Sequence, residues 1–239
     1  MIEANDLFKK SVKILNDNNI NYWICHGTLL GIIRDNKLLP WDHDIDFAIW
    51  EHEYSKEDIL KIFTKENGFK QEIVLEEINS LHFSTDNKRV DINFYSKNKD
   101  KAFIKWAVLP QTLLNKINYF IISFIAGNIE IAKAVKSSNG KIVSTIKYLM
   151  ILPLLLLRKI LSNSLKEKLL KSSYERFDII GYSYPLNLMD FKEIDFIGIK
   201  ITIPKKPEET LQFTYGDDWK IPKKNYVWYK EANNLFQQN

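Results

Sequence analysis

The chain has 239 residues, of which 45% are hydrophobic and 13% aromatic, enough to bury one sizeable core and too apolar for a disordered protein. Its net charge of +4 is mild and does not indicate a nucleic-acid-binding protein. A single cysteine, Cys25, excludes an intramolecular disulfide and argues against a cysteine zinc site. The first residues lack the basic-then-apolar order of a secretory signal, so we expect a cytoplasmic protein.

Positive charge is concentrated in one segment of the chain. Between Lys133 and Lys171 there are nine Lys or Arg residues and one acid, Glu167, a local excess of +8 in a chain whose total is +4. The remainder is therefore net acidic. We expect a cation-binding site in the acidic body and contact with an anionic partner through the basic segment.

The first hundred residues alternate between helical and strand patterns. Apolar residues recur at helical spacing near the N-terminus, and short apolar or alternating runs bounded by Gly or Pro follow. Pro40 interrupts any helix just before the run Asp44-Ile45-Asp46-Phe47-Ala48-Ile49, whose alternation predicts a strand with one buried face. The predicted elements are helices over residues 3–18, 29–34 and 55–67, and strands over residues 22–25, 44–49, 69–75, 81–84 and 89–95.

Beyond Pro110 the pattern changes to long apolar helices, and a strand pattern returns at Phe191. The helices are expected over residues 112–126, 129–136 and 141–161, with a further helix over 207–213 and a turn over 215–219. We therefore expect three parts, namely a catalytic core over residues 1–110, a helical insert over 111–178, and a C-terminal part over 179–239 that completes the core.

Three aspartates lie on the polar faces of two predicted strands. Side chains alternate along a strand, so Asp44 and Asp46 point the same way while the apolar residues beside them point into the core. Asp91 alternates with apolar residues in the same manner. Neighbouring carboxylates repel one another unless a cation lies between them, and hard cations such as Mg²⁺ prefer oxygen ligands. The pattern predicts a metal site if the two strands are neighbours.

An isolated Asp-x-Asp pair is more often a solvated turn or a helix cap than a metal site. Here Gly27 and Thr28 precede the pair at the start of a helix, where unpaired backbone N–H groups and the helix dipole favour a phosphate. A phosphate site that faces a carboxylate metal site is typical of phosphoryl or nucleotidyl transfer, because a cation offsets the charge that builds on the phosphate.

These residues resemble those of the LicD family, which includes the fukutin-related proteins and belongs to the polymerase-β-like nucleotidyltransferase superfamily. The run Pro40-Trp41-Asp42-His43-Asp44-Ile45-Asp46 is far more specific than a bare Asp-x-Asp. The resemblance implies an α/β nucleotidyltransferase fold with a small mixed β-sheet flanked by helices, to which the unmatched apolar, basic segment would add a helical insert. The matching text lies at residues 27–34, 39–46, 90–92, 203–204 and 215–219.

The resemblance implies a phosphotransferase that uses a CDP-linked donor, CDP-choline or a CDP-alditol. It would pass phosphocholine or a phospho-alditol to a hydroxyl of a cell-surface glycan, such as lipopolysaccharide, capsule or teichoic acid, and release CMP. By the resemblance, Asp44 and Asp46 would bind Mg²⁺ or Mn²⁺, and Asp91 would be a third metal ligand or the base for the acceptor hydroxyl.

The same resemblance assigns the donor phosphate to Gly27, Thr28 and Arg34 and makes Asp42 a support for the metal ligands. Two histidines each have two possible roles. His82 shares a strand face with Ser84 and could point toward the cleft, or it could be an ordinary surface or core residue. His26 precedes the phosphate turn and could touch the nucleotide or serve a structural role.

The apolar insert raises the question of membrane contact. Residues 142–157 would form a helix of roughly 24 Å, shorter than a hydrocarbon core of about 30 Å, and they include Lys147 and Pro153. A spanning helix is therefore not expected. One interpretation is a segment over residues 141–171 that lies on an anionic membrane at the inner face of the cell and brings the enzyme to a lipid-linked glycan. The alternative is a buried helical subdomain or a dimer contact.

Two other functions remain open for the same fold. A nucleotidyltransferase would add NMP to a small acceptor such as an antibiotic, and a catalytically silent protein would serve as a membrane-docking scaffold. Silent relatives of such enzymes usually lose one of the acids, and all three are present here. Nucleic-acid polymerisation is disfavoured because the basic segment lacks an interleaved aromatic track for bases.

Overall fold

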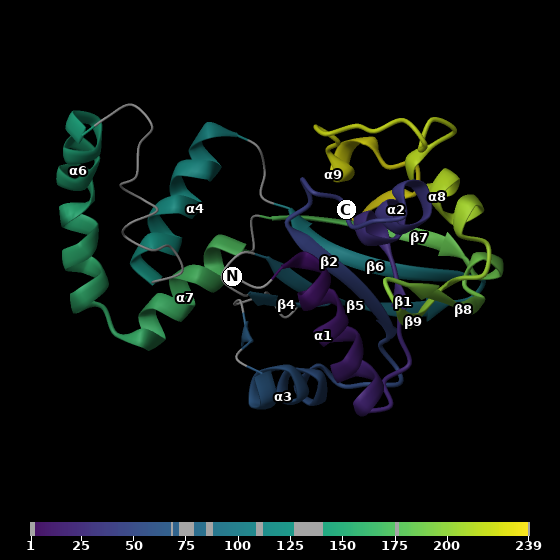
Figure 1. Ribbon diagram of the computed structural model, residues 1–239. Helices are drawn as coiled ribbons and strands as arrows, with labels where there is room; N and C mark the ends of the chain where they lie inside the picture. The colour runs from purple at the N-terminus through teal and green to yellow at the C-terminus, as the bar shows by residue number, and fades with distance from the viewer. Residues whose placement is uncertain are drawn as a thin grey trace. The chain divides into compact units, whose positions relative to one another are not determined.

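The computed structural model describes residues 3–67, 69–71, 79–84, 88–108, 112–126, 141–174 and 177–238. The chain divides into two compact units (Figure 1). The first unit combines Met1–Trp106 with Ile179–Asn239, and the second consists of Ala107–Asp178. The first unit contains every residue that the sequence places in the site.

A mixed β-sheet forms the centre of the first unit. Strands β2 and β5 run parallel, whereas the pairs β1–β2, β4–β5, β5–β6 and β7–β10 are antiparallel. The main path through the sheet is β1-β2-β5-β6-β7-β10, and β3 pairs with β4, which pairs with β5. This mixed sheet, flanked by helices, confirms the predicted α/β architecture. The strands are β1 (Trp23–Ile24), β2 (Asp44–Trp50), β3 (Lys70–Gln71), β4 (Ser80–Ser84), β5 (Arg89–Asn98), β6 (Lys101–Val108), β7 (Asp178–Pro185) and β10 (Leu235–Gln238).

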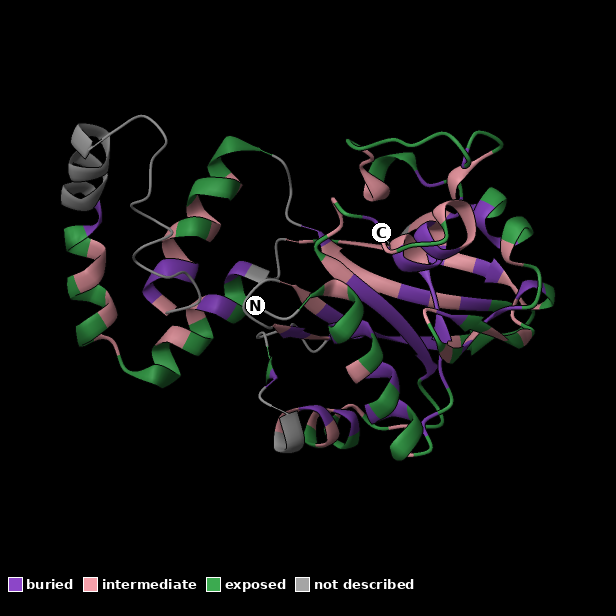
Figure 2. Cartoon of the chain, in the orientation of Figure 1, coloured by how far each residue is buried: buried purple, intermediate pink, exposed green. Residues whose placement is uncertain are grey.

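One face of β2 and β5 carries the larger core. Their alternate apolar side chains are buried in one cluster with those of the amphipathic helix α1 (Ala4–Asp17), the helix α3 (Lys56–Asn67) and a separate hairpin. Strand β2 is buried along most of its length (Figure 2). This burial explains the strands, because β-branched and aromatic residues at every second position bury best on a pleated surface. The residues that share this face are Ile45, Phe47, Ile49, Val90, Ile92 and Phe94.

The hairpin joins β8 (Phe191–Phe196) to β9 (Ile199–Pro204). Its two turn residues, Ile197 and Gly198, have φ angles of 44° and 81°, the left-handed values that two-residue hairpins use. The chain then enters α8 (Pro207–Tyr215), which begins with a proline as helices often do. The short elements η1 (Leu186–Leu188) and α9 (Trp228–Glu231) complete this part of the chain.

The opposite face of the sheet carries a second, aromatic core together with the acids. Trp23, Trp50 and Tyr95 pack there with two tyrosines of β7, Tyr182 and Tyr184. Helix α2 (His26–Asp35) follows β1 directly and contacts β2. The sheet therefore has an apolar face and a face on which aromatic and carboxyl side chains meet.

The second unit consists of helices α4 (Leu113–Ala126), α6 (Lys141–Ile160) and α7 (Asn163–Tyr174), and α4 contacts both of the others. Pro153 lies inside α6. In the described part of the chain, none of the helices combines the length and the apolar content that crossing a bilayer requires. The helix expected over residues 129–136 and most of the strand expected over 69–75 lie outside the described residues.

Candidate active site

The parallel pairing of β2 with β5 brings the predicted acids together. Asp46 lies opposite Asp91 in the register of the two strands, and Asp44 lies opposite Arg89. Residues paired in this way project to the same side of a sheet, so all three acids share the face that is opposite the larger core. The exposed fractions of Asp46 and Asp91 are only 8% and 4%. Two buried carboxylates are thus held as direct neighbours.

Arg89 supplies positive charge between these acids. Its Nη2 donates to Oδ2 of Asp44 at 2.8 Å, and its Nε and Nη2 donate to the two carboxylate oxygens of Asp91 at 2.7 and 2.8 Å. Such a two-pronged contact is the strong arrangement for Arg and a carboxylate. The sequence interpretation did not include Arg89, although its place two residues before Asp91 on the same strand puts both on one face.

His82 also reaches the later acid. Strand β4 pairs with β5 so that His82 lies opposite Asp91, and its Nδ1 is 2.9 Å from Oδ1 of Asp91 without the alignment of a hydrogen bond. Its Nε2 lies 2.8 Å from the hydroxyl of Ser80. Ser80 is buried, so its hydroxyl is not exposed as a nucleophile. The face that His82 shares with Ser84 was the sequence signal for this placement.

The first two acids of the motif titrate together with Asp46. Burial, then a hydrogen bond with the Asp44 carboxyl, raises the pKa of Asp42 to about 8. Burial also acts to raise the pKa of Asp44, but the hydrogen bond from Asp42 and the charge of Arg89 outweigh it and lower that pKa. Burial, followed by the charges of Asp44 and Asp91, raises the pKa of Asp46 well above its usual range. Near pH 7 these shifts favour the protonated forms of Asp42 and Asp46 and the ionised form of Asp44.

Helix α2 begins beside this cluster. A Cβ atom at Gly27 would overlap a carboxylate oxygen of Asp42, so a larger residue would displace that side chain from the helix start. The hydroxyl of Thr28, which is 2% exposed, accepts a hydrogen bond of 2.8 Å from the backbone N–H of Asp46. Thr28 thereby ties α2 to β2 at the level of the acids. A phosphate at this helix start would meet backbone N–H groups, and the Thr28 hydroxyl, which accepts its hydrogen bond from Asp46, keeps its own proton to donate.

Arg34 lies away from the helix start. It occupies the last turn of α2, and its Nε and Nη2 donate to the two carboxylate oxygens of Asp35 at 2.9 and 2.8 Å. The start and the end of a helix of ten residues are roughly 14 Å apart. The structure therefore places Gly27, Thr28 and Asp42 beside the acids. The side chain of Arg34 instead contacts Asp35.

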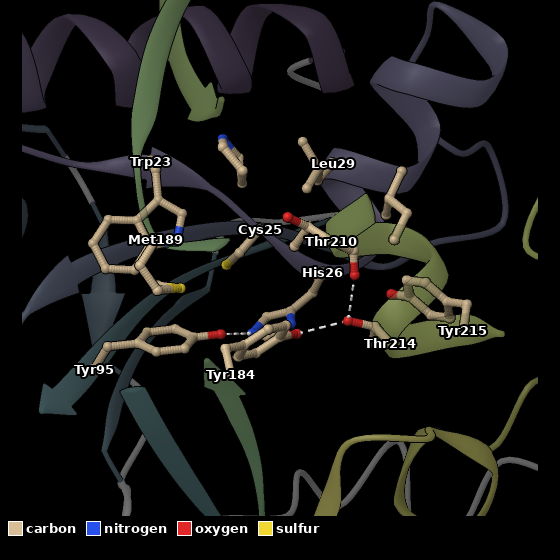
Figure 3. Close-up of a pocket in the computed structure, with 12 residues that line it drawn as sticks. Trp23, Cys25, His26, Leu29, Tyr95, Tyr184, Met189, Thr210, Thr214 and Tyr215 are labelled. Carbon is tan, nitrogen blue, oxygen red and sulfur yellow. Dashed lines mark hydrogen bonds between the residues drawn. The ribbon is translucent and has the colours of Figure 1, made fainter. Parts of the chain in front are cut away.

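A small pocket opens next to the acids on the same face of the sheet (Figure 3). Asn93 links the two places, since its Nδ2 lies 3.4 Å from Oδ1 of Asp46 and 3.8 Å from Sγ of Cys25. The space inside amounts to about 20 Å³, enough for a group the size of a water molecule. The residues that line it are Trp23, Cys25, His26, Leu29, Tyr95, Tyr184, Met189, Pro204, Thr210, Leu211, Thr214 and Tyr215.

His26 is the titratable base of this pocket. Burial lowers its pKa to about 4, so the imidazole is neutral near pH 7. The hydroxyl of Tyr95 lies 3.3 Å from its Nε2, while its buried Nδ1 finds no hydrogen-bond partner among the described residues. His26 also adopts a left-handed φ of 49°. His26, the first residue of α2, lies in the pocket wall beside Tyr95 and Tyr184 (Figure 3).

The carboxylates suit a divalent cation by their chemistry. Asp44, Asp46 and Asp91 offer the oxygen ligands that Mg²⁺ and Mn²⁺ prefer. Over the residues that the structure describes, however, no group of three or more His, Cys, Asp or Glu side chains is arranged to hold a metal ion. Arg89 takes up oxygens of Asp44 and Asp91, so an ion would compete with its guanidinium.

Comparison with known proteins relates this site to one family. Residues 19–118 match the family model described as LicD/FKTN/FKRP, nucleotidyltransferase domain. An uncharacterised protein of Rickettsia typhi is 35% identical over 96 residues, which cover 40% of this chain and 29% of that protein. The solution structure of the antibiotic-resistance factor ANT(2'')-Ia covers 71% of this chain and 90% of its own, with 14% identity and a TM-score of 0.34, too loose a match to support a conclusion.

Two further relatives align along nearly the whole chain. Ribitol-5-phosphate transferase FKTN of Mus musculus is 30% identical over 97% of this chain and 36% of its own length. The Homo sapiens protein of the same name is 26% identical over 97% of this chain and again 36% of its own length. The chain thus spans about a third of the length of these relatives. The matched stretch, residues 19–118, contains the acids of β2 and β5, and over it the chain is similar to the LicD/FKTN/FKRP nucleotidyltransferase domain.

Proposed function

We propose that this chain is a metal-dependent phosphotransferase. It moves a phosphate-linked group from a CDP-linked donor to a hydroxyl of a cell-surface glycan and releases CMP. The observation that carries the proposal is the register of β2 and β5, which sets the buried Asp46 directly opposite the buried Asp91 beside the start of α2. Two adjacent buried carboxylates are costly to keep charged unless a cation or a reaction uses them.

Each residue of the cluster has a proposed role. Asp44 and Asp46 would hold Mg²⁺ or Mn²⁺, which when bound offsets the negative charge of the transferring phosphate, and Asp91 would be either a third ligand or the base for the acceptor hydroxyl. The backbone at Gly27 lets the donor phosphate approach the start of α2, and Thr28 keeps that helix in place against Asp46. Asp42 shares a proton with Asp44 and so limits the charge of the motif.

The reaction forms one bond and breaks one. The acceptor hydroxyl oxygen bonds to the donor phosphorus that bears the transferred group, and the bond from that phosphorus to the CMP oxygen breaks. Asp91 takes the hydroxyl proton in this scheme, and His82 and Arg89 hold its carboxylate in position. Arg34 pairs with Asp35. In this scheme Arg34 contacts the donor phosphate only after that ion pair separates.

A CDP-alditol is the favoured donor. Support comes from the FKTN relatives, which are named ribitol-5-phosphate transferases and align with 97% of this chain. CDP-choline remains the second donor to be tested. The acceptor would be a glycan of lipopolysaccharide, capsule or teichoic acid type carried on a lipid, which would place the enzyme at the inner face of the cell membrane.

The test is a donor screen. The purified chain is incubated with CDP-ribitol, CDP-glycerol or CDP-choline in the presence of Mg²⁺ or Mn²⁺, and CMP release is measured by chromatography. We expect release from one donor that stops when the cation is chelated. A donor labelled in both halves then shows which half reaches the acceptor.

Two outcomes would overturn the proposal. Transfer of the labelled nucleotide half to a small acceptor would show NMP transfer instead. Absence of both donor binding and CMP release, with the cation present and the protein folded, would favour a silent scaffold.

A further inference from the structure

The described half of α6 is apolar on two sides. Ile151 is buried, with an exposed fraction of 5%. On the other side Leu152, Leu156 and Ile160 follow one another at intervals of four residues and are 41%, 59% and 67% exposed. Residues spaced in this way form a line along one face of a helix. A helix that is apolar all round is normally covered on both sides, in a core or by lipid.

The exposed apolar surface extends beyond this line of three residues. Leu157 lies beside it and is 42% exposed, and Leu165 of the following helix α7 is 43% exposed. We call these five side chains, Leu152, Leu156, Leu157, Ile160 and Leu165, the leucine face. The line from residue 152 to residue 160 is roughly 12 Å long, at 1.5 Å per residue.

Basic residues border the leucine face. Lys159 is exposed within the same turn as Ile160, and Lys166, Lys168 and Lys171 follow on α7. Glu167 is the acid in the stretch from residue 151 to residue 171. Long lysine side chains at the edge of an apolar strip keep their charge in water while their stems lie along it, as at the surface of an anionic membrane.

We propose that the leucine face docks the protein onto an anionic lipid bilayer. The segment lies along the membrane surface, with the leucines among the upper acyl chains and the lysines near the lipid phosphates. A lipid surface fits better than a second copy of the chain, since two copies joined through this face would bring their lysines together. Docking needs neither donor nor acceptor, so it extends the proposed transferase activity without depending on it.

Vesicle binding tests the proposal on the full chain. The protein is sedimented with vesicles of phosphatidylcholine alone and with vesicles that also contain phosphatidylglycerol, at low and high salt. We expect at least about tenfold tighter binding to the anionic vesicles, and loss of that preference at high salt, because each lysine near the surface contributes electrostatic attraction that salt screens.

Matched variants locate the surface. The double substitution Leu156→Glu with Ile160→Glu should weaken binding to anionic vesicles at least about tenfold, because glutamate places charge at the apolar boundary. Ile221→Glu is the control, since Ile221 is 62% exposed but lies in the first unit. Circular dichroism confirms that each variant is folded.

Three results would overturn the proposal. The first two are equal binding to neutral and anionic vesicles, and unchanged vesicle binding by the double variant. The third is a parent chain that is dimeric and a double variant that is monomeric, with neither protein binding to vesicles. The last result would make the leucine face a contact between copies. Because the measurement contains no nucleotide, its failure would leave the proposed transfer reaction standing.

Discussion

Individual charges in the site are more informative than its net charge. Four aspartates, at positions 42, 44, 46 and 91, gather around one guanidinium from Arg89. Burial and mutual repulsion raise the pKa of Asp46. Each substitution among them should therefore affect stability and activity differently.

Asp46→Asn separates these two effects. The amide keeps the shape of the carboxyl but cannot bind a cation as strongly, so CMP release should fall at least about 100-fold. The free energy of unfolding in chelator should stay equal or rise, because the buried charge is disfavoured already. CMP-release kinetics and urea unfolding measure the two quantities.

Asp17→Asn is the control for this substitution, since Asp17 is an exposed residue of α1 that pairs with Lys13. It should change neither quantity. Residual activity of Asp46→Asn above a tenth of the parent rate would contradict the role of Asp46.

Arg89→Gln tests whether the guanidinium and a divalent cation compete. Without cation, the loss of the contacts to Asp44 and Asp91 should lower the free energy of unfolding by about 1–3 kcal/mol. Addition of Mn²⁺ should then raise the melting temperature more in the variant than in the parent chain, because the ion replaces the missing charge. Differential scanning calorimetry with and without Mn²⁺ measures this.

Arg34→Gln is the matched control, because it removes another two-pronged Arg–Asp contact of the same unit. Its melting temperature should shift equally with and without Mn²⁺. An equal response of Arg89→Gln would argue that the ion does not take the place of the guanidinium.

His26 makes stability depend on pH. Its pKa is lowered to about 4 from an ordinary value of 6.5, so between these pH values the unfolded chain binds a proton that the folded chain does not. This contribution is fully present above pH 6.5 and is lost as the pH falls toward 4, by at most about 3 kcal/mol. His26→Asn, which tolerates the left-handed φ, should remove that part of the pH dependence.

Urea unfolding at pH 7.5 and pH 4.5 gives the measurement, with the difference between variant and parent compared at the two pH values. His52→Asn is the control, since His52 is exposed. If His26→Asn lost as much stability on acidification as the parent chain, the assignment of a buried, neutral imidazole to His26 would be rejected.

At the scale of elements, β7 shows how closely the strands approach. Gly181 of β7 lies opposite Phe236 of β10, and a Cβ there would overlap the backbone carbonyl of Ile104 and lie 2.8 Å from the Phe236 ring. Gly181→Ala should lower the free energy of unfolding by about 1–3 kcal/mol through overpacking. Urea unfolding measures the loss.

Ser183→Ala, two residues further along the same strand, is the comparison and should change stability by less than about 0.5 kcal/mol. Equal losses for the two variants would show that β7 tolerates a side chain at Gly181.

The elements also show where sequence patterns succeed. Helices α1, α3 and α4 and strands β2, β4 and β5 follow the predicted spans within a few residues, because each repeats apolar residues at its own period over several turns or pairs. Strands β6, β7 and β10 were not predicted. Gly181 and Pro185 interrupt the pattern of β7, and β10 is only four residues long, so both depend on their neighbours in the sheet.

At the scale of the whole molecule, we expect each of the two units to carry its own function. Strands β6 and β7 are neighbours in the sheet, so a short Gly/Ser linker in place of residues 109–176 can join them. We expect the shortened chain to keep a cooperative unfolding transition and CMP release but to lose binding to anionic vesicles. Vesicle sedimentation and CMP release are measured on the same preparation.

The full-length chain is the reference for both measurements. A shortened chain that folds and still binds anionic vesicles would place the lipid contact in the first unit. A shortened chain that folds but releases no CMP would mean that the second unit contributes to the proposed reaction.

The sequence by itself determined which residues face the polar side of each strand. The two-residue period around Asp44, Asp46 and Asp91 is a local property, and it placed each acid opposite the core before any partner strand was known. The same local signals predicted the mixed α/β fold and the LicD resemblance.

Only the tertiary structure decided what these acids meet. The parallel pairing of β2 with β5 sets Asp46 beside Asp91, which is 45 positions further along the chain, and brings Arg89 between Asp44 and Asp91. The register of strands that are distant in sequence is chosen by the packing of the entire sheet, since a shift by one residue would turn every side chain to the other face. No local pattern contains that choice.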